Sequence, residues 1–338
     1  MINNIKKPFL IAEISANHDG KIKDAKKLIY QAKKYGADAV KLQTYSPDTI
    51  TLNSKNKFFK IKKGPWKNYF FWDLYKKGQT PLSWHQELFQ YANKLKIRIF
   101  STPFDETAVN FLESLNCPFY KLSSFEITHI PLIKKIASKK KHMIISTGMA
   151  SLKEIKTAYD TALKYGAKGV TLLYCVSNYP SDISDFNLTN ISIMREKFHC
   201  EVGLSDHSLD NSISSIAVAL GARMFEKHIA LNKKKGLDSK FSLVGKEILE
   251  YKKNLIKIYK LVKNKKFYRS KEELKNKIFR RSIFSSQDIR KGEKFSHDNI
   301  KVVRPSNGLE PIYYEKLIGK KSKFNIKKFT PIKIKYIL

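Results

Sequence analysis

The sequence predicts an α/β protein, a (β/α)8 TIM barrel followed by a small β-rich domain. From residue 8 to about residue 264, short β-branched or aromatic runs alternate with amphipathic segments of helical spacing. Eight runs of each kind occur, and their combined length of about 250 residues is typical of such a barrel. Hydrophobic residues make up 42% of the 338 residues, which supplies ample material for a core.

The barrel elements follow in regular order. The expected strands cover 9–15, 39–44, 98–103, 119–124, 142–147, 169–175, 201–205 and 223–228. The expected helices cover 25–35, 83–95, 106–115, 130–138, 152–165, 188–197, 211–220 and 246–262. A doubly wound open sheet is the alternative. It is disfavoured because ISANHDG follows the first strand, where that fold would place a glycine-rich phosphate loop.

Three further segments complete the organisation. The insertion at 49–79 is too long for an ordinary loop and carries Trp66 and Trp72, so we expect it to form a packed lid or pocket wall. We expect the barrel domain to cover 1–264 and a charged linker to cover 265–279. The β-rich domain then covers 280–338, with strand-like runs at 280–286 and 300–306.

The composition excludes several classes of protein. The net charge is +35, which suggests nucleic acid as a partner, but the lysines are spread over the chain and no nucleic-acid-binding motif appears. The three cysteines form no CxxC pair and fit a reducing compartment. The first apolar run meets Glu13 too soon for a signal peptide, and no run is long enough to span a membrane. We therefore expect a cytoplasmic protein that binds neither nucleic acid nor membrane.

Charged and polar side chains stand where the expected strands end, which is where barrel enzymes carry their chemistry. Lysines there suit an anionic ligand, and two histidines at the ends of consecutive strands suit a divalent metal. Each short motif alone would more often be an ordinary loop, so it is their coincidence that indicates an active site. The strand-end residues are Glu13, Lys41, Gln43, Thr102, Lys121, Ser123, Ser124, Glu126, Ser146, Tyr179, Ser205, Asp206, His207, Glu226, Lys227 and His228.

The ordered set of these motifs resembles the sialic acid synthase family. The blocks that carry the resemblance are FLIAEISANHDG, VKLQTY, FSTPFDE, YKLSSFEI, IISTGMAS, YCVSNYP, VGLSDHS and MFEKHIAL. Downstream, RRSIF, KGE, VVRPSNGL and IGKK resemble the antifreeze-like (SAF) domain of the same family. GPW at 64–66 and WDLYKKGQTPLSWH at 72–85 are most similar to the pseudaminic acid synthase subgroup.

The resemblance implies a transferase of the EC 2.5.1 class. It implies a metal-dependent condensation of phosphoenolpyruvate with 2,4-diacetamido-2,4,6-trideoxy-L-altrose that gives pseudaminate and phosphate. N-acetylneuraminate and legionaminate synthases, which use other acetamido sugars, are the alternative. A barrel that condenses phosphoenolpyruvate with a sugar phosphate is a further alternative, and the SAF-like tail argues against it.

The resemblance also implies roles for individual residues and a domain-swapped homodimer with each SAF domain over the other subunit's barrel. The implied catalytic carboxylate is Glu13, and the implied ligands of a divalent metal, Mn2+ with Mg2+ or Co2+ as alternatives, are His207 and His228. The implied phosphoenolpyruvate-binding residues are Lys41, Thr102, Lys121, Ser124, Ser146 and Ser205. The implied sugar-binding residues are Gln43, Tyr179, Asp238 and Arg304, the last reaching the sugar from the partner subunit.

Overall fold

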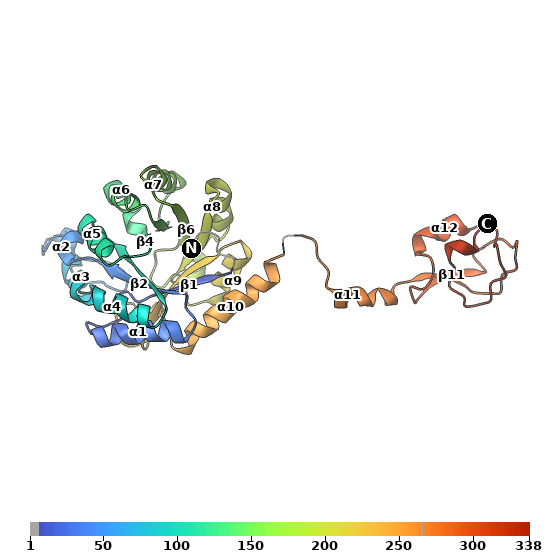
Figure 1. Cartoon of the computed structure of the whole chain (residues 1–338), viewed down its shortest axis with the longest axis horizontal. Coiled ribbons are helices and arrows are strands. Elements are labelled where there is room, and N and C mark those ends of the chain that lie inside the picture. Colours follow the sequence, from blue (N-terminus) through green and yellow to red (C-terminus); the bar gives the residue numbers. More distant parts are fainter. Residues whose placement is uncertain (1–6, 265) are drawn as a thin grey trace. The chain divides into compact units, whose positions relative to one another are not determined.

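The computed structural model describes residues 7–264 and 266–338. Its contacts divide the chain into two compact units, and the boundary along the chain lies between Lys263 and Asn264 (Figure 1). Each unit has its own hydrophobic core. In the part of the chain that the structure describes, no helix combines the length and the apolar character that a membrane span requires.

The first unit is a closed barrel of eight parallel strands, and the predicted (β/α)8 fold is confirmed. Each strand pairs with the next, and β1 also pairs with β8, which closes the sheet and rules out the open doubly wound alternative. A short ninth strand, β9 (Leu243–Val244), pairs with the end of β8. The barrel strands are β1 (Phe9–Glu13), β2 (Ala39–Thr44), β3 (Arg98–Pro103), β4 (Tyr120–Leu122), β5 (His142–Ser146), β6 (Gly169–Cys175), β7 (Glu201–Asp206) and β8 (Met224–Ala230).

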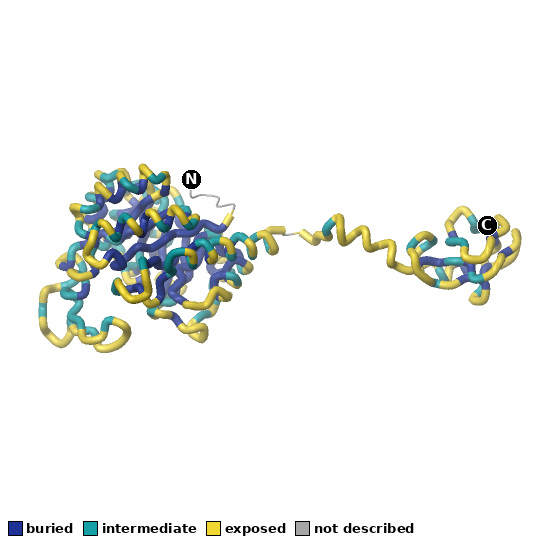
Figure 2. The backbone as a smooth tube through the Cα atoms, turned by 90° about the horizontal axis from the view of Figure 1, so that it is seen from below, coloured by how far each residue is buried: buried dark blue, intermediate teal, exposed yellow. Residues whose placement is uncertain are grey.

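Helices surround the barrel strands on the outside (Figure 1). Their buried faces cover the sheet, and Figure 2 shows the strands as the most completely buried part of the unit. The long helix α10 begins after Gly245 and ends at Val262, as predicted. The outer helices are α1 (Ile22–Lys34), α4 (Leu82–Lys94), α5 (Glu106–Ser114), α6 (Ile130–Ala137), α7 (Leu152–Lys164), α8 (Asn190–Phe198), α9 (Asn211–Ala219) and α10 (Lys246–Val262).

Five of the eight barrel strands differ from their expected bounds: β1, β5 and β7 by one or two residues at the carboxyl end, and β4 and β8 as follows. The expected strand at 119–124 is shorter in the structure, because the chain turns at Ser123 into the 3-10 helix η2 (Ser124–Glu126). In contrast, β8 continues to Ala230, since Ile229 and Ala230 gain β9 as a pairing partner. Both differences lie at the carboxyl ends of the strands, where loops shape the site.

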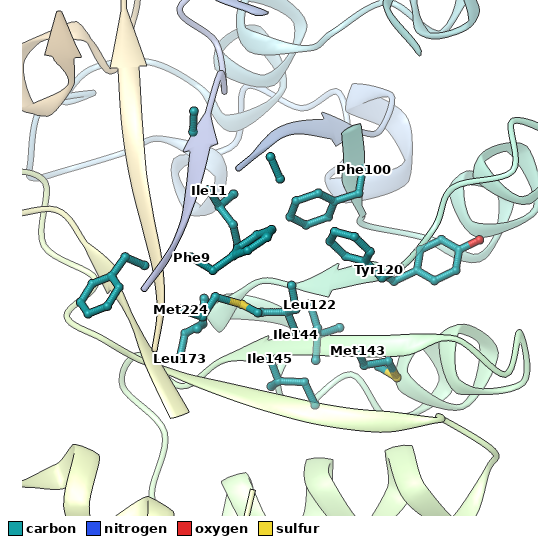
Figure 3. Close-up of a cluster of buried hydrophobic side chains, with 14 of the residues drawn as sticks. Phe9, Ile11, Phe100, Tyr120, Leu122, Met143, Ile144, Ile145, Leu173 and Met224 are labelled. Atoms are coloured by element: carbon teal, nitrogen blue, oxygen red, sulfur yellow. The ribbon is translucent and has the colours of Figure 1, made fainter. Parts of the chain in front are cut away.

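An apolar layer fills the lower part of the barrel. Phe9, Phe100, Ile144 and Met224 come from four different strands and are almost fully buried (Figure 3). Gly203 on β7 lies next to Met224. A Cβ atom at Gly203 would lie 2.1 Å from the carbonyl oxygen of Met224, so only glycine fits there. The absence of a side chain at this position lets β7 and β8 approach closely. We call this packed layer the apolar floor of the barrel. The polar residues described below lie above it, towards the carboxyl ends of the strands.

The inserted segment forms ordered structure beside the barrel mouth. It contains α2 (Pro47–Ile50), the 3-10 helix η1 (Lys57–Phe59) and α3 (Phe71–Gly78). Between η1 and α3, an antiparallel bridge joins Lys60 and Phe70 and closes a small hairpin. The insertion is thus ordered, which is consistent with the expectation that it forms a packed lid or pocket wall.

The second unit is β-rich. Its strands β10 (Ser282–Ser285) and β11 (Ile300–Val303) pair antiparallel, near the strand-like runs expected at 280–286 and 300–306. The expected linker contains a short helix, α11 (Lys271–Lys275), capped by Ser270, and the 3-10 helix η5 (Asn276–Phe279). The core of the unit consists of Ile283, Ile289, Phe295, Ile300, Leu317, Ile326 and Ile332.

Candidate active site

Four buried charges lie above the apolar floor of the barrel. Lys41 on β2 approaches Glu13 on β1, with 2.7 Å between its Nζ and the Glu13 Oε2. Its Nζ also lies 3.7 Å from Oε2 of Glu226 on β8. Lys121 on β4 completes the group, since its Nζ lies 3.9 Å from Oε1 of Glu226. All four side chains are at most 5% exposed, so two cations and two carboxylates compensate one another within the barrel.

The buried ion array changes the pKa values of its members. Burial raises the pKa of Glu13, and the neighbouring Lys41 opposes that shift only in part. Burial also acts on Glu226, but the attraction of Lys121 and Lys41 outweighs it and the pKa of Glu226 is lowered. Burial lowers the pKa of Lys121, whereas Glu13 and Glu226 outweigh burial at Lys41 and raise its pKa. The two carboxylates therefore differ: Glu226 favours the charged form, and Glu13 takes up a proton more readily.

Glu226 was not among the residues assigned a role from sequence, although it stands at a strand end. Residues two apart on a strand point to the same face, and Glu226 and His228 are two apart. The assignment of His228 to the site could therefore have indicated that Glu226 points into it as well. What the sequence does not show is that Glu226 lies between the lysines of β2 and β4. It also accepts a hydrogen bond of 3.0 Å from Ser205.

Hydroxyl and amide groups surround the four charges. Lys41 lies 3.1 Å from the Thr102 hydroxyl, and Gln43 donates to Glu13 at 3.2 Å. Ser124 accepts a hydrogen bond from the backbone N–H of Gly148. The buried hydroxyl of Ser146 has no hydrogen-bond partner within residues 7–264 and 266–338. The structure thus brings Thr102 and Gln43 against the charged array, and it leaves Ser146 free to bind a ligand.

A histidine pair stands beside the ion array. The rings of His207 and His228 are 5.2 Å apart between centroids. His228 is adjacent to Glu13 in the register of β8 and β1. Asp238 lies 3.6 Å from Nδ1 of His228 and accepts a hydrogen bond from Ser15, which in turn accepts one from Gln43. The two histidines, Asp238 and Gln43 therefore belong to one connected site.

The histidine pair fits a divalent metal with open coordination positions. Nδ1 of His207 lies 3.1 Å from the Val176 carbonyl oxygen, which directs that nitrogen to the backbone and leaves Nε2 available as a ligand. Nδ1 of His228 is buried and has no hydrogen-bond partner in the described part of the chain. Burial together with His207 holds the pKa of His228 well below its usual range. Within residues 7–264 and 266–338, no group of three or more His, Cys, Asp or Glu side chains is arranged for a metal. Two imidazoles would therefore have to share the ion with oxygen ligands from water or substrate.

Aromatic side chains enclose the histidine pair. Tyr179 packs on His207 with 4.4 Å between ring centroids, and Phe241 lies 5.1 Å from His228. Trp66 from the inserted segment packs on Tyr179 at 5.4 Å. The expectation that the insertion forms a pocket wall agrees with this contact. Arg304 belongs to the other unit, where it follows β11 and is exposed.

Comparison with known proteins identifies related sequences over almost the entire chain. A model of the NeuB family matches residues 28–267, and a model of the SAF domain matches residues 280–336. Pseudaminic acid synthase from Campylobacter jejuni is 43% identical, covering 96% of this chain and 95% of that protein. N,N'-diacetyllegionaminic acid synthase from the same organism is 38% identical, covering 96% and 98%.

A similar fold occurs in solved structures. The N-acetylneuraminic acid (sialic acid) synthetase of Leptospira borgpetersenii, crystallised with citrate, superposes with a TM-score of 0.73 at 29% identity. The similarity covers 81% of this chain and 91% of that one.

The position of Glu226 generates a stability prediction. We expect Glu226→Gln to lower the free energy of unfolding by about 3–5 kcal/mol, because it leaves a buried lysine without its carboxylate. Urea unfolding followed by tryptophan fluorescence measures this in the barrel, since Trp66, Trp72 and Trp84 all lie in the first unit.

The matched control is Glu87→Gln. Glu87 forms an ion pair with Lys26, but its side chain is 54% exposed, so its loss should cost less than about 1 kcal/mol. Equal losses in the two variants would contradict a special role for Glu226 in holding the lysines.

Proposed function

The chain belongs to the NeuB family, and from that premise we propose that it condenses phosphoenolpyruvate with 2,4-diacetamido-2,4,6-trideoxy-L-altrose to give pseudaminate and phosphate. The observation that carries the proposal is the buried array of Lys41 and Lys121 beside the histidine pair. In this proposal the lysines bind a small anion, and the neighbouring histidine pair serves a carbonyl compound. The 43% identity to a pseudaminic acid synthase over nearly the full length supports the choice of sugar.

We assign the phosphoenolpyruvate end of the site to the two lysines and their neighbouring hydroxyls. A phosphate or carboxylate placed there would gain charge-assisted hydrogen bonds from Lys41 and Lys121. The unpartnered hydroxyl of Ser146 supplies a further donor, and Thr102, Ser124 and Ser205 complete the assignment. Glu226 lies close to both ammonium groups and neutralises part of their charge. We infer that these contacts keep the two lysines in position when no anion is bound.

The reaction forms a bond between C3 of phosphoenolpyruvate and the aldehyde carbon of the open-chain sugar. The aldehyde oxygen takes up a proton and becomes a hydroxyl group. Water then adds to C2 and gives up a proton, and phosphate leaves with cleavage of the C2–O bond. Glu13 is the proposed group that orients this water, since it is buried, its pKa is raised, and Gln43 and Lys41 fix both of its oxygens.

We assign His207 and His228 as the protein ligands of a divalent metal, with Mn2+ proposed. When bound, such an ion would polarise the aldehyde oxygen. The chain itself orients His207 through the Val176 carbonyl and places Asp238 next to His228. The packing of Tyr179 on His207 supports its assignment to the sugar site, and Gln43 and Asp238 are the proposed polar contacts to the sugar.

The quaternary arrangement is part of the proposal. We propose a cytoplasmic homodimer in which Arg304 reaches the sugar of the partner subunit. Arg304 is exposed and follows a strand of a unit whose core contains seven fully buried hydrophobic residues among the described ones, so that small unit gains stability from packing on another surface. A monomer in light scattering at assay concentration would contradict this arrangement.

A substrate panel tests the proposed function. The purified protein receives phosphoenolpyruvate, Mn2+ and, in parallel, the pseudaminate-, legionaminate- and mannosamine-type aminosugars, and phosphate release is measured. We expect release to be fastest with 2,4-diacetamido-2,4,6-trideoxy-L-altrose and to require all three components. Preference for the legionaminate-type sugar would favour the alternative suggested by the 38% identical relative.

Two controls in the same panel address the metal. A chelator should abolish phosphate release, and added Mn2+ should restore it. His228→Ala should weaken Mn2+ binding in a direct titration, independently of turnover. Turnover that survives both chelation and this substitution would refute the assigned metal site.

The phosphoenolpyruvate assignment predicts a charge-specific defect. Lys121→Met preserves most of the volume of the side chain and removes its charge, so we expect KM for phosphoenolpyruvate to rise about 10- to 150-fold. The matched control is Lys153→Met on the exposed surface of α7, which should leave KM unchanged. An unchanged KM in Lys121→Met would refute the assignment.

A further inference from the structure

A hairpin within the inserted segment presents Trp66 to the site. The backbone N–H of Ile61 donates to the carbonyl of Tyr69 at 2.9 Å, and the N–H of Asn68 donates to that of Ile61 at 2.9 Å. These bonds close a turn that contains Trp66. The turn is held on both sides, so the position of the indole is determined by backbone pairing as well as by its contact with Tyr179.

Among the residues that the structure describes, none accepts a hydrogen bond from the indole N–H of Trp66. Its Nε1 atom is buried and has no hydrogen-bond partner, whereas Trp72 in the same segment donates to Asp48 at 2.8 Å. Indole carries a donor and no acceptor, and buried donors in proteins are normally paired. An unpaired donor beside a substrate site is therefore explained most simply by an acceptor on the substrate.

The distance from the histidines is within the reach of a substituent on a carbon beyond the aldehyde end of the sugar. The centroids of Trp66 and Tyr179 are 5.4 Å apart and those of Tyr179 and His207 are 4.4 Å apart, so the indole lies within about 10 Å of the imidazole. An extended six-carbon chain is about 6 Å long, judged from standard carbon–carbon bond lengths. A sugar held by its aldehyde end near His207 thus brings the substituents of its distal carbons within reach of Trp66.

We propose that Trp66 determines specificity at C4 of the sugar by donating its indole N–H to the carbonyl oxygen of the 4-acetamido group. This inference rests on the proposed function. An acetamido carbonyl extends further from C4 than a hydroxyl oxygen does, so it can reach the wall formed by Trp66 and Tyr179. The acetamido methyl group suits the aromatic faces of the same wall.

The test compares two sugars and two variants. The sugars are the 2,4-diacetamido substrate and the analogue that carries a hydroxyl group at C4. Trp66→Phe keeps an aromatic ring and removes the N–H, so we expect the ratio of kcat/KM for the two sugars to fall about 2- to 12-fold, as for one lost hydrogen bond. The loss should occur with the diacetamido sugar, and KM for phosphoenolpyruvate should be unchanged. Trp72→Phe, which loses a donor that is already paired with Asp48, should leave the ratio as in the wild type.

The outcomes separate the two levels of the proposal. If the wild type prefers the diacetamido sugar and Trp66→Phe keeps the full preference, the role of Trp66 is wrong and the proposed function stands. Equal losses with both sugars would also overturn the inference, because they indicate general packing. If the wild type prefers the C4-hydroxyl sugar, the proposed function fails and the inference fails with it.

Discussion

The site depends on the mutual compensation of four charges inside the barrel. Each of Glu13, Lys41, Lys121 and Glu226 would be costly to bury alone, since the desolvation of a single ion costs several kcal/mol. Together they carry no net charge, and each touches at least one partner of opposite sign. The barrel can therefore keep two ammonium groups in a dry, packed place. An anion bound there would meet fixed cations instead of mobile, hydrated ones.

The apolar layer below the four charges and the aromatic side chains beside them have different roles. Below it, the apolar layer with Phe100 and Met224 excludes water and fixes the strands that carry the charges. Gly203 lets two of those strands approach closely. Beside it, Tyr179 packs on both Trp66 and His207 and adds an aromatic surface next to the histidine pair. The charges of the site therefore come from the barrel strands, whereas the aromatic surface beside them comes from the loops and the inserted segment.

The overall charge of +35 has less influence on the site than these few residues. Only Lys41 and Lys121 are proposed to bind the anionic phosphoenolpyruvate, and most other lysines lie on solvated faces. Exposed charges separated by more than about 8 Å are largely screened at physiological salt. The excess can raise the encounter rate with an anion, but it cannot replace a buried, hydrogen-bonded contact.

The sequence by itself determined the barrel, because the alternation of strands and helices is local and β2, β3 and β6 have the predicted bounds. It also located the lysines and histidines, since each lies on, or directly after, a different strand of the barrel. The tertiary structure alone decided that Glu226 lies between two lysines from other strands and that Trp66 reaches Tyr179. Those contacts join residues more than 100 positions apart, and they arise only when the barrel closes in one register. No local pattern encodes that closure.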